Sequence, residues 1–124
     1  MPQGRVVIVD DYAEALESLA LVVEGWGYEV EGTRTGAEAL RILARKPPPT
    51  AAIVDLALPD IAGCEIIRRM KTVVPGIVVI AHSGHHELRA RALGAGADAF
   101  VLKPDFEVIE DVLARRALAS RGAV

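Results

Sequence analysis

The stretch AAIVDLALPDIAG, residues 51–63, decides the fold. It opens with an apolar run, Ala51 to Val54, without alternating polar residues, and such a run is typical of a strand buried on both faces of a parallel sheet. The run ends on an acid, Asp55, and a proline and a glycine soon follow. Because an unpaired carboxylate is costly to bury, this acid indicates either a charged partner or a chemical role.

Short apolar runs of this kind alternate with longer segments of helical periodicity along the chain. The predicted strands are 5–10, 28–34, 51–55, 76–82 and 98–103. The predicted helices are about 13–24, one that begins at a capping box over 35–38, one that carries Ile66 to Val74, about 86–93, and one that begins near Asp105. Strands that alternate with helices pair in parallel through right-handed crossovers, so the sequence predicts an α/β fold with helices on both faces of the sheet.

Length, charge and cysteine content narrow the class of protein. A chain of 124 residues fits one domain, which we place at 1–119, with a C-terminal tail or the beginning of a linker at 120–124. A net charge of −3 excludes a broad electrostatic footprint for nucleic acid. The N-terminus has no long apolar stretch, so we expect neither a signal peptide nor a membrane span. The single cysteine, Cys64, excludes an internal disulfide and is typical of a cytoplasmic protein.

Polar side chains follow four of the predicted strands at the point where each strand ends. They are Asp10 and Asp11 after the first strand, Asp55 after the third, His82 and Ser83 after the fourth, and Lys103 and Pro104 after the fifth. In an open parallel sheet, ligands bind beyond the carboxyl ends of the strands, where the strand order reverses. In the order 2-1-3-4-5 this point lies between the first and third strands. Three carboxylates, a hydroxyl and an ammonium group are therefore expected at one edge of the sheet.

These groups suit phosphoryl transfer. Clustered carboxylates repel one another and favour a hard cation, and Mg²⁺ takes carboxylate, water and phosphate oxygens as ligands. A carboxylate can also attack phosphorus as a nucleophile and form an aspartyl phosphate. The charge of the transferring phosphoryl group needs cations and hydrogen-bond donors around it, and Lys103, Mg²⁺ and Ser83 would supply them.

Simpler interpretations exist for several of these residues. Asp10 and Asp11 could cap the first helix, and Asp11 could do both jobs. The histidines of HSGHH, residues 82–86, invite a zinc interpretation, but a structural zinc site takes four ligands and no other soft ligand is nearby in sequence. The basic residues within 68–71 are interpreted as a solvated helix face.

Two enzyme classes are weaker alternatives. A phosphatase with an aspartate nucleophile usually needs a second acid two residues on, and this chain has Ala57 there. Flavin binding would need a loop that cradles phosphate after the first strand, and the segment VDDYAEA, residues 9–15, is acidic instead.

Taken together, the motifs resemble the receiver domain of two-component response regulators, from Arg5 to about Leu118. The matching segments are VIVDD (7–11), GYEV (27–30), TGAEAL (35–40), VDLALPDIAG (54–63), VIAHSG (79–84) and ALGAGADAFVLKP (92–104). Each segment alone is a weak signal, and the ordered set is highly specific. The resemblance implies a flavodoxin-like, doubly wound (βα)5 fold with a five-stranded parallel sheet in the order 2-1-3-4-5.

The resemblance also implies roles for the residues at the predicted site. Asp55 would accept the phosphoryl group, and it would hold Mg²⁺ together with Asp10, Asp11 and the backbone carbonyl group of Ala57. Lys103 would pair with the acids at rest and with the phosphate after transfer. Because residue 57 is alanine, no side chain there can position an attacking water, and this bears on the lifetime of the phosphate.

Three further positions match residues that the family uses in its conformational change or its backbone geometry. Ser83 would be the switch hydroxyl, Phe100 the switch aromatic, and Pro104 a structural proline whose preceding peptide bond is often cis. Phe100 could equally be a plain core residue. The segment between Ser83 and Lys103 is two residues shorter than the common pattern, and Gly84 replaces the usual alanine, so the conformational readout is where this chain departs from the family.

The function that the resemblance implies is a signalling switch, not an enzyme, although such a domain promotes its own Mg²⁺-dependent phosphorylation and dephosphorylation. A histidine kinase or histidine phosphotransfer protein would supply the phosphoryl group, and an effector domain or protein would receive the signal. The surface of the fourth helix, fifth strand and fifth helix is a candidate interface for a homodimer, and we expect no direct nucleic acid binding by this domain and no membrane contact. The alternative is a degenerate receiver, an interaction module that never uses the phosphate.

Overall fold

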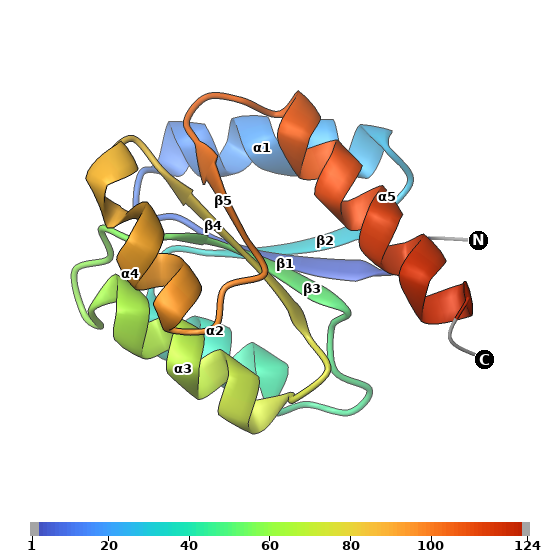
Figure 1. Cartoon of the computed structure of the whole chain (residues 1–124), viewed down its shortest axis with the longest axis horizontal. Coiled ribbons are helices and arrows are strands. Elements are labelled where there is room, and N and C mark those ends of the chain that lie inside the picture. The colour runs from blue at the N-terminus through green and yellow to red at the C-terminus, as the bar shows by residue number, and fades with distance from the viewer. Residues whose placement is uncertain (1–2, 123–124) are drawn as a thin grey trace.

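The described part of the chain, residues 3–122 with side chains through residue 116, forms in this computed structural model a five-stranded sheet between two layers of helices (Figure 1). The strands are β1 (Arg5–Val9), β2 (Glu29–Thr33), β3 (Ala51–Asp55), β4 (Val78–Ser83) and β5 (Ala99–Leu102). The helices are α1 (Ala13–Gly25), α2 (Gly36–Leu43), α3 (Gly63–Val73), the 3-10 turn η1 (His86–Leu88), α4 (Arg89–Gly94) and α5 (Glu107–Gly122).

The strand order is β2-β1-β3-β4-β5 and every pair is parallel, which confirms the predicted topology. Helices α1 and α5 cover one face of the sheet, and α2, α3 and α4 cover the other (Figure 1). Val9 pairs with Val54, and Asp55 pairs with His82, so the carboxyl ends of β1, β3 and β4 reach the same edge. The order reverses between β1 and β3, and the predicted site lies there.

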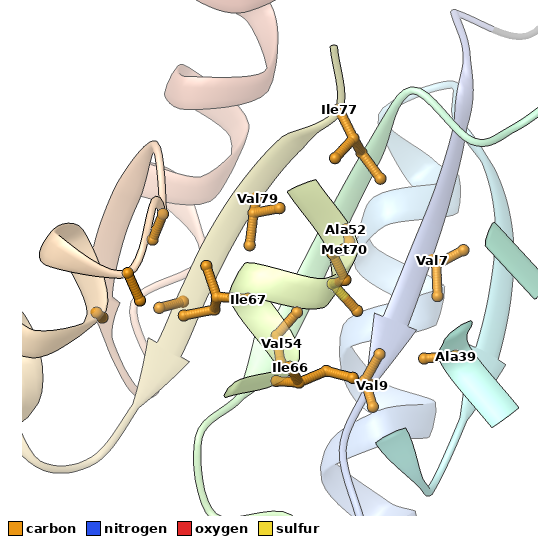
Figure 2. Packing of buried hydrophobic residues seen from close by; sticks show 14 of the residues in the cluster. Val7, Val9, Ala39, Ala52, Val54, Ile66, Ile67, Met70, Ile77 and Val79 are labelled. Carbon is orange, nitrogen blue, oxygen red and sulfur yellow. The ribbon is translucent and has the colours of Figure 1, made fainter. Parts of the chain in front are cut away.

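The three interior strands, β1, β3 and β4, are buried on both faces, which explains why their sequences show no polar alternation. The residues of β1 and β3 that pack toward α2 and α3 are Val7, Val9, Ala52 and Val54. Figure 2 shows them beside Ile66, Ile67 and Met70 of α3. The intervening residues that pack toward α1 are Val6, Ile8, Ala51 and Ile53. Each large side chain buried in this way stabilises the fold by roughly 1.5–3 kcal/mol relative to an exposed one.

The start of α2 differs in one detail from the capping box predicted over 35–38. Thr35 caps the helix as expected, because its Oγ1 accepts a hydrogen bond from the N–H of Glu38 at 3.2 Å. In a full capping box the Glu38 carboxylate would accept a bond from the N–H of Thr35. Here that N–H donates to the hydroxyl oxygen of Thr33 at 3.5 Å. The Glu38 carboxylate instead accepts a bond from Arg41 at 2.6 Å. The helix is therefore capped by half of the predicted box.

Lys71 is not part of a solvated face. Its Nζ donates to the carbonyl oxygen of Ile77 and to Asp98, both at 2.6 Å. Asp98 also accepts a bond from the N–H of Val79 at 2.8 Å. These bonds tie α3 to β4 and to the segment before β5, so the interpretation of the basic residues within 68–71 as solvated is wrong for this lysine.

The C-terminal half has a short fourth helix and a long fifth one. Helix α4 has 6 residues, of which only Ala92 is buried. Helix α5 continues to Gly122, so the boundary expected at residue 119 lies inside a helix, and the end of the domain stays a prediction. Over the residues described, no helix combines the length and the apolar character needed to cross a membrane.

Candidate functional site

Three carboxylates meet at the edge of the sheet where the strand order reverses. Asp10 directly follows β1, Asp11 is the next residue, and Asp55 is the last residue of β3. One carboxylate oxygen from each lies within 4.8 Å of the other two. Asp10 and Asp55 are only 4% and 7% exposed, so two of these three charges are held away from water.

The ammonium group of Lys103, which follows β5, lies between the two buried acids. Its Nζ is 2.8 Å from Oδ2 of Asp10 and 3.5 Å from Oδ2 of Asp55. The other oxygens of these acids accept backbone bonds, Asp10 from the N–H of Tyr12 at 3.0 Å and Asp55 from the N–H of Ala57 at 3.1 Å. Each buried carboxylate thus has one oxygen fixed by its own loop and one facing the lysine.

The acid cluster carries more negative charge than its counter-ion balances. Burial raises the pKa of Asp55, and the charge of Asp10 adds to this, against the opposing effects of the Ala57 N–H group and Lys103. Burial opposes the charged form of Lys103, yet its hydrogen bond to Asp10 and the charges of both acids raise its pKa above the usual value. The lysine is therefore firmly protonated, while the surroundings of Asp55 favour its neutral form more than water would.

The donor set of the cluster fits a hard divalent cation. Carboxylate oxygens are the ligands that Mg²⁺ prefers, with waters and phosphate oxygens to complete its octahedron. Elsewhere in the part of the chain that the structure describes, no three histidine, cysteine or acidic side chains lie close enough to hold a metal ion. The three histidines within residues 82–86 are not gathered at one site. His82 is buried, whereas the side chains of His85 and His86 are 67% and 84% exposed.

Ser83 and Phe100 are both buried, at 2% and 8% exposure. Ser83 ends β4, one residue beyond the His82 that pairs with Asp55, and its Oγ accepts a bond from the N–H of His85 at 3.1 Å. Phe100 packs in the core on the α3 and α4 side of the sheet. Burial is expected both of a core residue and of a switch aromatic in its inward position, so the switch roles stay predictions. The Lys103–Pro104 peptide bond is cis, as the resemblance implied.

His82, which the sequence analysis placed at a strand end and in the zinc interpretation, is a buried neutral histidine that the sequence did not predict. Its Nε2 has no hydrogen-bond partner, and its ring centroid lies 6.3 Å from that of Phe106. Burial, with the charge of Lys103, lowers its pKa to about 4, although the charges of Asp10 and Asp105 oppose this. The side chain is therefore neutral at pH 7. The available signal was its place in a strand buried on both faces, where even a polar residue is enclosed.

Two polar residues at the loops of the site were also missed from the sequence: Arg34, which contacts the loop after β1, and Asp60, which lies in the loop after β3. Arg34 donates from Nε and Nη2 to the carbonyl oxygen of Asp11 at 3.0 and 2.9 Å. Asp60 accepts bonds from the N–H groups of Gly36 and Ala37, both at 2.9 Å. The two N–H groups lower the pKa of this carboxyl group.

Comparison with known protein sequences assigns the chain to one family. Residues 6–114 match the family model described as the response regulator receiver domain. The probable transcriptional regulatory protein TcrX of Mycobacterium tuberculosis is 34% identical over 123 residues, which are 96% of this chain and 51% of that protein. The chain spans about half the length of the curated relatives that it matches, several of which are named as transcriptional regulators.

Solved structures give the same result. A response regulator receiver domain protein (CheY-like) from Methanospirillum hungatei has a TM-score of 0.84 and 30% identity, with 95% of this chain and 97% of that chain covered. A response regulator protein from Burkholderia pseudomallei has a TM-score of 0.77 and 25% identity, with 96% of this chain and 71% of that chain covered. The structure of the latter contains a phosphorylated aspartic acid, a calcium ion and citrate.

Proposed function

The chain belongs to the response regulator receiver domain family, and on this premise we propose that it is a signalling switch phosphorylated on Asp55. The observation that carries the proposal is the position of Lys103, 2.8 Å from Asp10 and 3.5 Å from Asp55 beside a third acid. An ammonium group and a carboxylate at the same strand ends supply a nucleophile and a cation for the incoming phosphoryl group. The phosphorylated aspartic acid in the Burkholderia pseudomallei structure supports the same chemistry.

Asp55 acts as the nucleophile in this proposal. A carboxylate oxygen attacks the phosphorus of a phosphohistidine, the new O–P bond forms as the N–P bond breaks, and the imidazole leaves with the electron pair of that bond. The partner that carries this phosphohistidine is a histidine kinase or a histidine phosphotransfer protein. Lys103 then pairs with a phosphate oxygen, and the Ser83 hydroxyl donates to another.

Mg²⁺ would be held by Asp10, Asp11, Asp55 and the carbonyl group of Ala57. When bound, it neutralises the charge that the acids and the phosphoryl group share, which is what allows a phosphodonor to approach so acidic a site. The fit of the three carboxylates to a hard cation supports this assignment. The carbonyl of Ala57 enters through the family resemblance, and the Ala57 N–H already orients Asp55.

The output passes through the surface of α4, β5 and α5 to an effector, or to a second copy of the chain. Phosphate draws the Ser83 hydroxyl toward itself, and Phe100 fills the space behind it. Moving a conformational population from 1:99 to 99:1 takes about 5.5 kcal/mol of differential binding, so the contacts of Lys103 and the metal must add to that of Ser83. Because several relatives are named as transcriptional regulators and are about twice as long, we infer that the effector, not this domain, contacts nucleic acid.

The alternative is a degenerate receiver that binds partners without phosphate. The convergence of Asp10, Asp11, Asp55 and Lys103 favours the phosphorylated switch, since a module that had lost the reaction would need none of them together.

Intact-mass measurement after incubation with acetyl phosphate separates these functions. We expect one added phosphoryl group with Mg²⁺, none in EDTA, and none in Asp55→Asn. Asp111→Asn is the matched control, because Asp111 is an exposed acid on α5 that pairs with Arg115, and it should be labelled like the wild type. Equal labelling of the wild type and Asp55→Asn would sink the assignment, and an unlabelled wild type would favour the degenerate receiver.

A further inference from the structure

A short segment at the start of α2 touches both loops of the acid cluster. On one side, the guanidinium group of Arg34 donates two bonds to the carbonyl oxygen of Asp11, at 3.0 and 2.9 Å. On the other side, Asp60 lies in the loop between β3 and α3 and accepts bonds from the N–H groups of Gly36 and Ala37, both at 2.9 Å. The segment 34–37 therefore joins the loop after β1 to the loop after β3.

We propose that Arg34 and Asp60 are positioning residues that brace these two loops and thereby set the affinity of the acid cluster for Mg²⁺. The inference rests on the proposed function, because it concerns the metal that this function requires. Neither residue touches the ion. Arg34 acts through the backbone of the ligand Asp11, and Asp60 acts through the loop that begins at Asp55.

The brace is needed most on the side of Asp11, because regular sheet pairing ends just before it. The last backbone bond of the β1–β2 ladder runs from the N–H of Asp10 to the carbonyl of Thr33 at 3.1 Å. Beyond it, the carbonyl of Asp11 is held by Arg34. A planar guanidinium group that donates twice to one oxygen fixes that peptide plane more firmly than a single freely rotating donor could.

The Asp60 side of the brace is rigid for two reasons. Both oxygens of Asp60 are engaged by consecutive N–H groups in the first turn of α2, groups that have no partner within the helix itself. The helix also packs closely here, because a Cβ placed on Gly36 would lie 3.1 Å from Cδ1 of Ile61 and 3.2 Å from Cδ1 of Ile66. The loop after β3 therefore cannot shift without moving the start of α2.

Charge-conserving substitutions isolate this geometric effect. Arg34→Lys keeps the positive charge but loses the two-pronged donor, and Asp60→Glu keeps the negative charge but displaces the carboxylate. Outer partners of metal ligands typically change metal affinity about 10–100-fold. Because both residues act through the backbone, we expect each variant to bind Mg²⁺ about 10-fold more weakly, the low end of that range.

Calorimetric titration of the full chain with MgCl₂, without any phosphodonor, measures this effect directly. The controls are Arg41→Lys, an exposed α2 arginine paired with Glu38, and Asp111→Glu on α5, both of which should bind Mg²⁺ like the wild type. A second readout is the Mg²⁺ dependence of phosphorylation by acetyl phosphate: the half-saturating Mg²⁺ concentration should rise in the variants while the rate at saturating Mg²⁺ stays that of the wild type. Asp60→Glu should also shift the metal-free amide resonances of Gly36 and Ala37.

Mg²⁺ affinities within twofold of the wild type in both folded variants would overturn the brace, as would a wild type that binds no Mg²⁺. If Asp60→Glu does not fold, Asp60→Asn, which keeps one acceptor oxygen, is measured against the same criterion. The titration is independent of phosphorylation. A wild type that binds Mg²⁺ but is never phosphorylated would refute the proposed function, while weaker binding by the variants would still support the brace.

Discussion

Replacing Asp55 with asparagine should stabilise the metal-free protein, although it removes the proposed phosphoacceptor. Ionised Asp55 faces two carboxylates within 4.8 Å and one ammonium group at 3.5 Å. At an effective dielectric constant of about 20, a carboxylate charge 4.8 Å away repels it by about 3.5 kcal/mol, and Lys103 attracts it by about 4.7 kcal/mol. The balance is about 2 kcal/mol against the anion before the cost of burial, and we expect about 1–2 kcal/mol after screening by nearby water.

Asparagine preserves the other contacts of the site. Its side-chain oxygen can still accept the bond from the Ala57 N–H, and Lys103 keeps its bond to Asp10 at 2.8 Å. The raised pKa of Asp55 agrees with this balance of charges, because a pKa that is higher in the folded state means that the fold favours the neutral acid. The advantage of asparagine should therefore shrink as the pH falls and Asp55 of the wild type becomes protonated.

The assay is urea unfolding of the wild type and Asp55→Asn at pH 7 in EDTA, followed by circular dichroism. Asp55→Asn should show the larger free energy of unfolding. With millimolar Mg²⁺ the wild type should gain more than the variant, because the metal relieves repulsion that the variant has already lost. An Asp55→Asn variant that is equally stable or less stable in EDTA would contradict the account of the acid cluster as a site of excess negative charge.

Three further predictions concern the stability contributed by residues outside the acid cluster. His82 is neutral in the fold, with its pKa lowered from 6.5 to about 4, so the unfolded state binds more protons between these values. The wild type should therefore lose up to about 3 kcal/mol as the pH falls through this range, and His82→Leu should lack this component in urea titrations; an unchanged pH profile would count against it. Lys71→Met leaves Asp98 short of a counter-ion and should cost about 2 kcal/mol in the same assay at pH 7, a loss that a fully solvated lysine would not produce. Gly63→Ala places a Cβ 2.7 Å from the carbonyl oxygen of Leu56 and should destabilise by about 1–3 kcal/mol, whereas an unchanged thermal midpoint would mean that the loop after β3 gives way freely.

The topology and the acid cluster could be predicted from sequence for the same reason. Asp10, Asp55 and Lys103 each stand directly at the end of an apolar run, so the positions of the strands, with the strand order that the resemblance implied, were enough to bring them together. No side-chain detail was required, because strand ends in a parallel sheet share one edge.

The contacts around the cluster depend on the paths of the loops, and the sequence does not reveal these. Arg34 and Asp11 are 23 residues apart, and Lys71 and Asp98 are 27 apart. Nothing in a solvent-facing pattern says which arginine or lysine will find a carbonyl or carboxylate that a distant loop presents. The same limit applies at Thr35, where local spacing predicted the cap correctly but could not show that Glu38 would pair with Arg41.

The central claim is that Asp55, and no neighbouring acid, carries the phosphoryl group. Borohydride trapping tests it most directly, because the reagent reduces an aspartyl phosphate to the alcohol and so converts that one residue to homoserine. The protein is incubated with acetyl phosphate, with Mg²⁺ or with EDTA, reduced, digested, and analysed by peptide mass spectrometry. We predict homoserine at position 55 in the Mg²⁺ sample alone. Homoserine at position 10 or 11, or phosphoryl label on the intact protein without any homoserine at 55, would contradict the assignment.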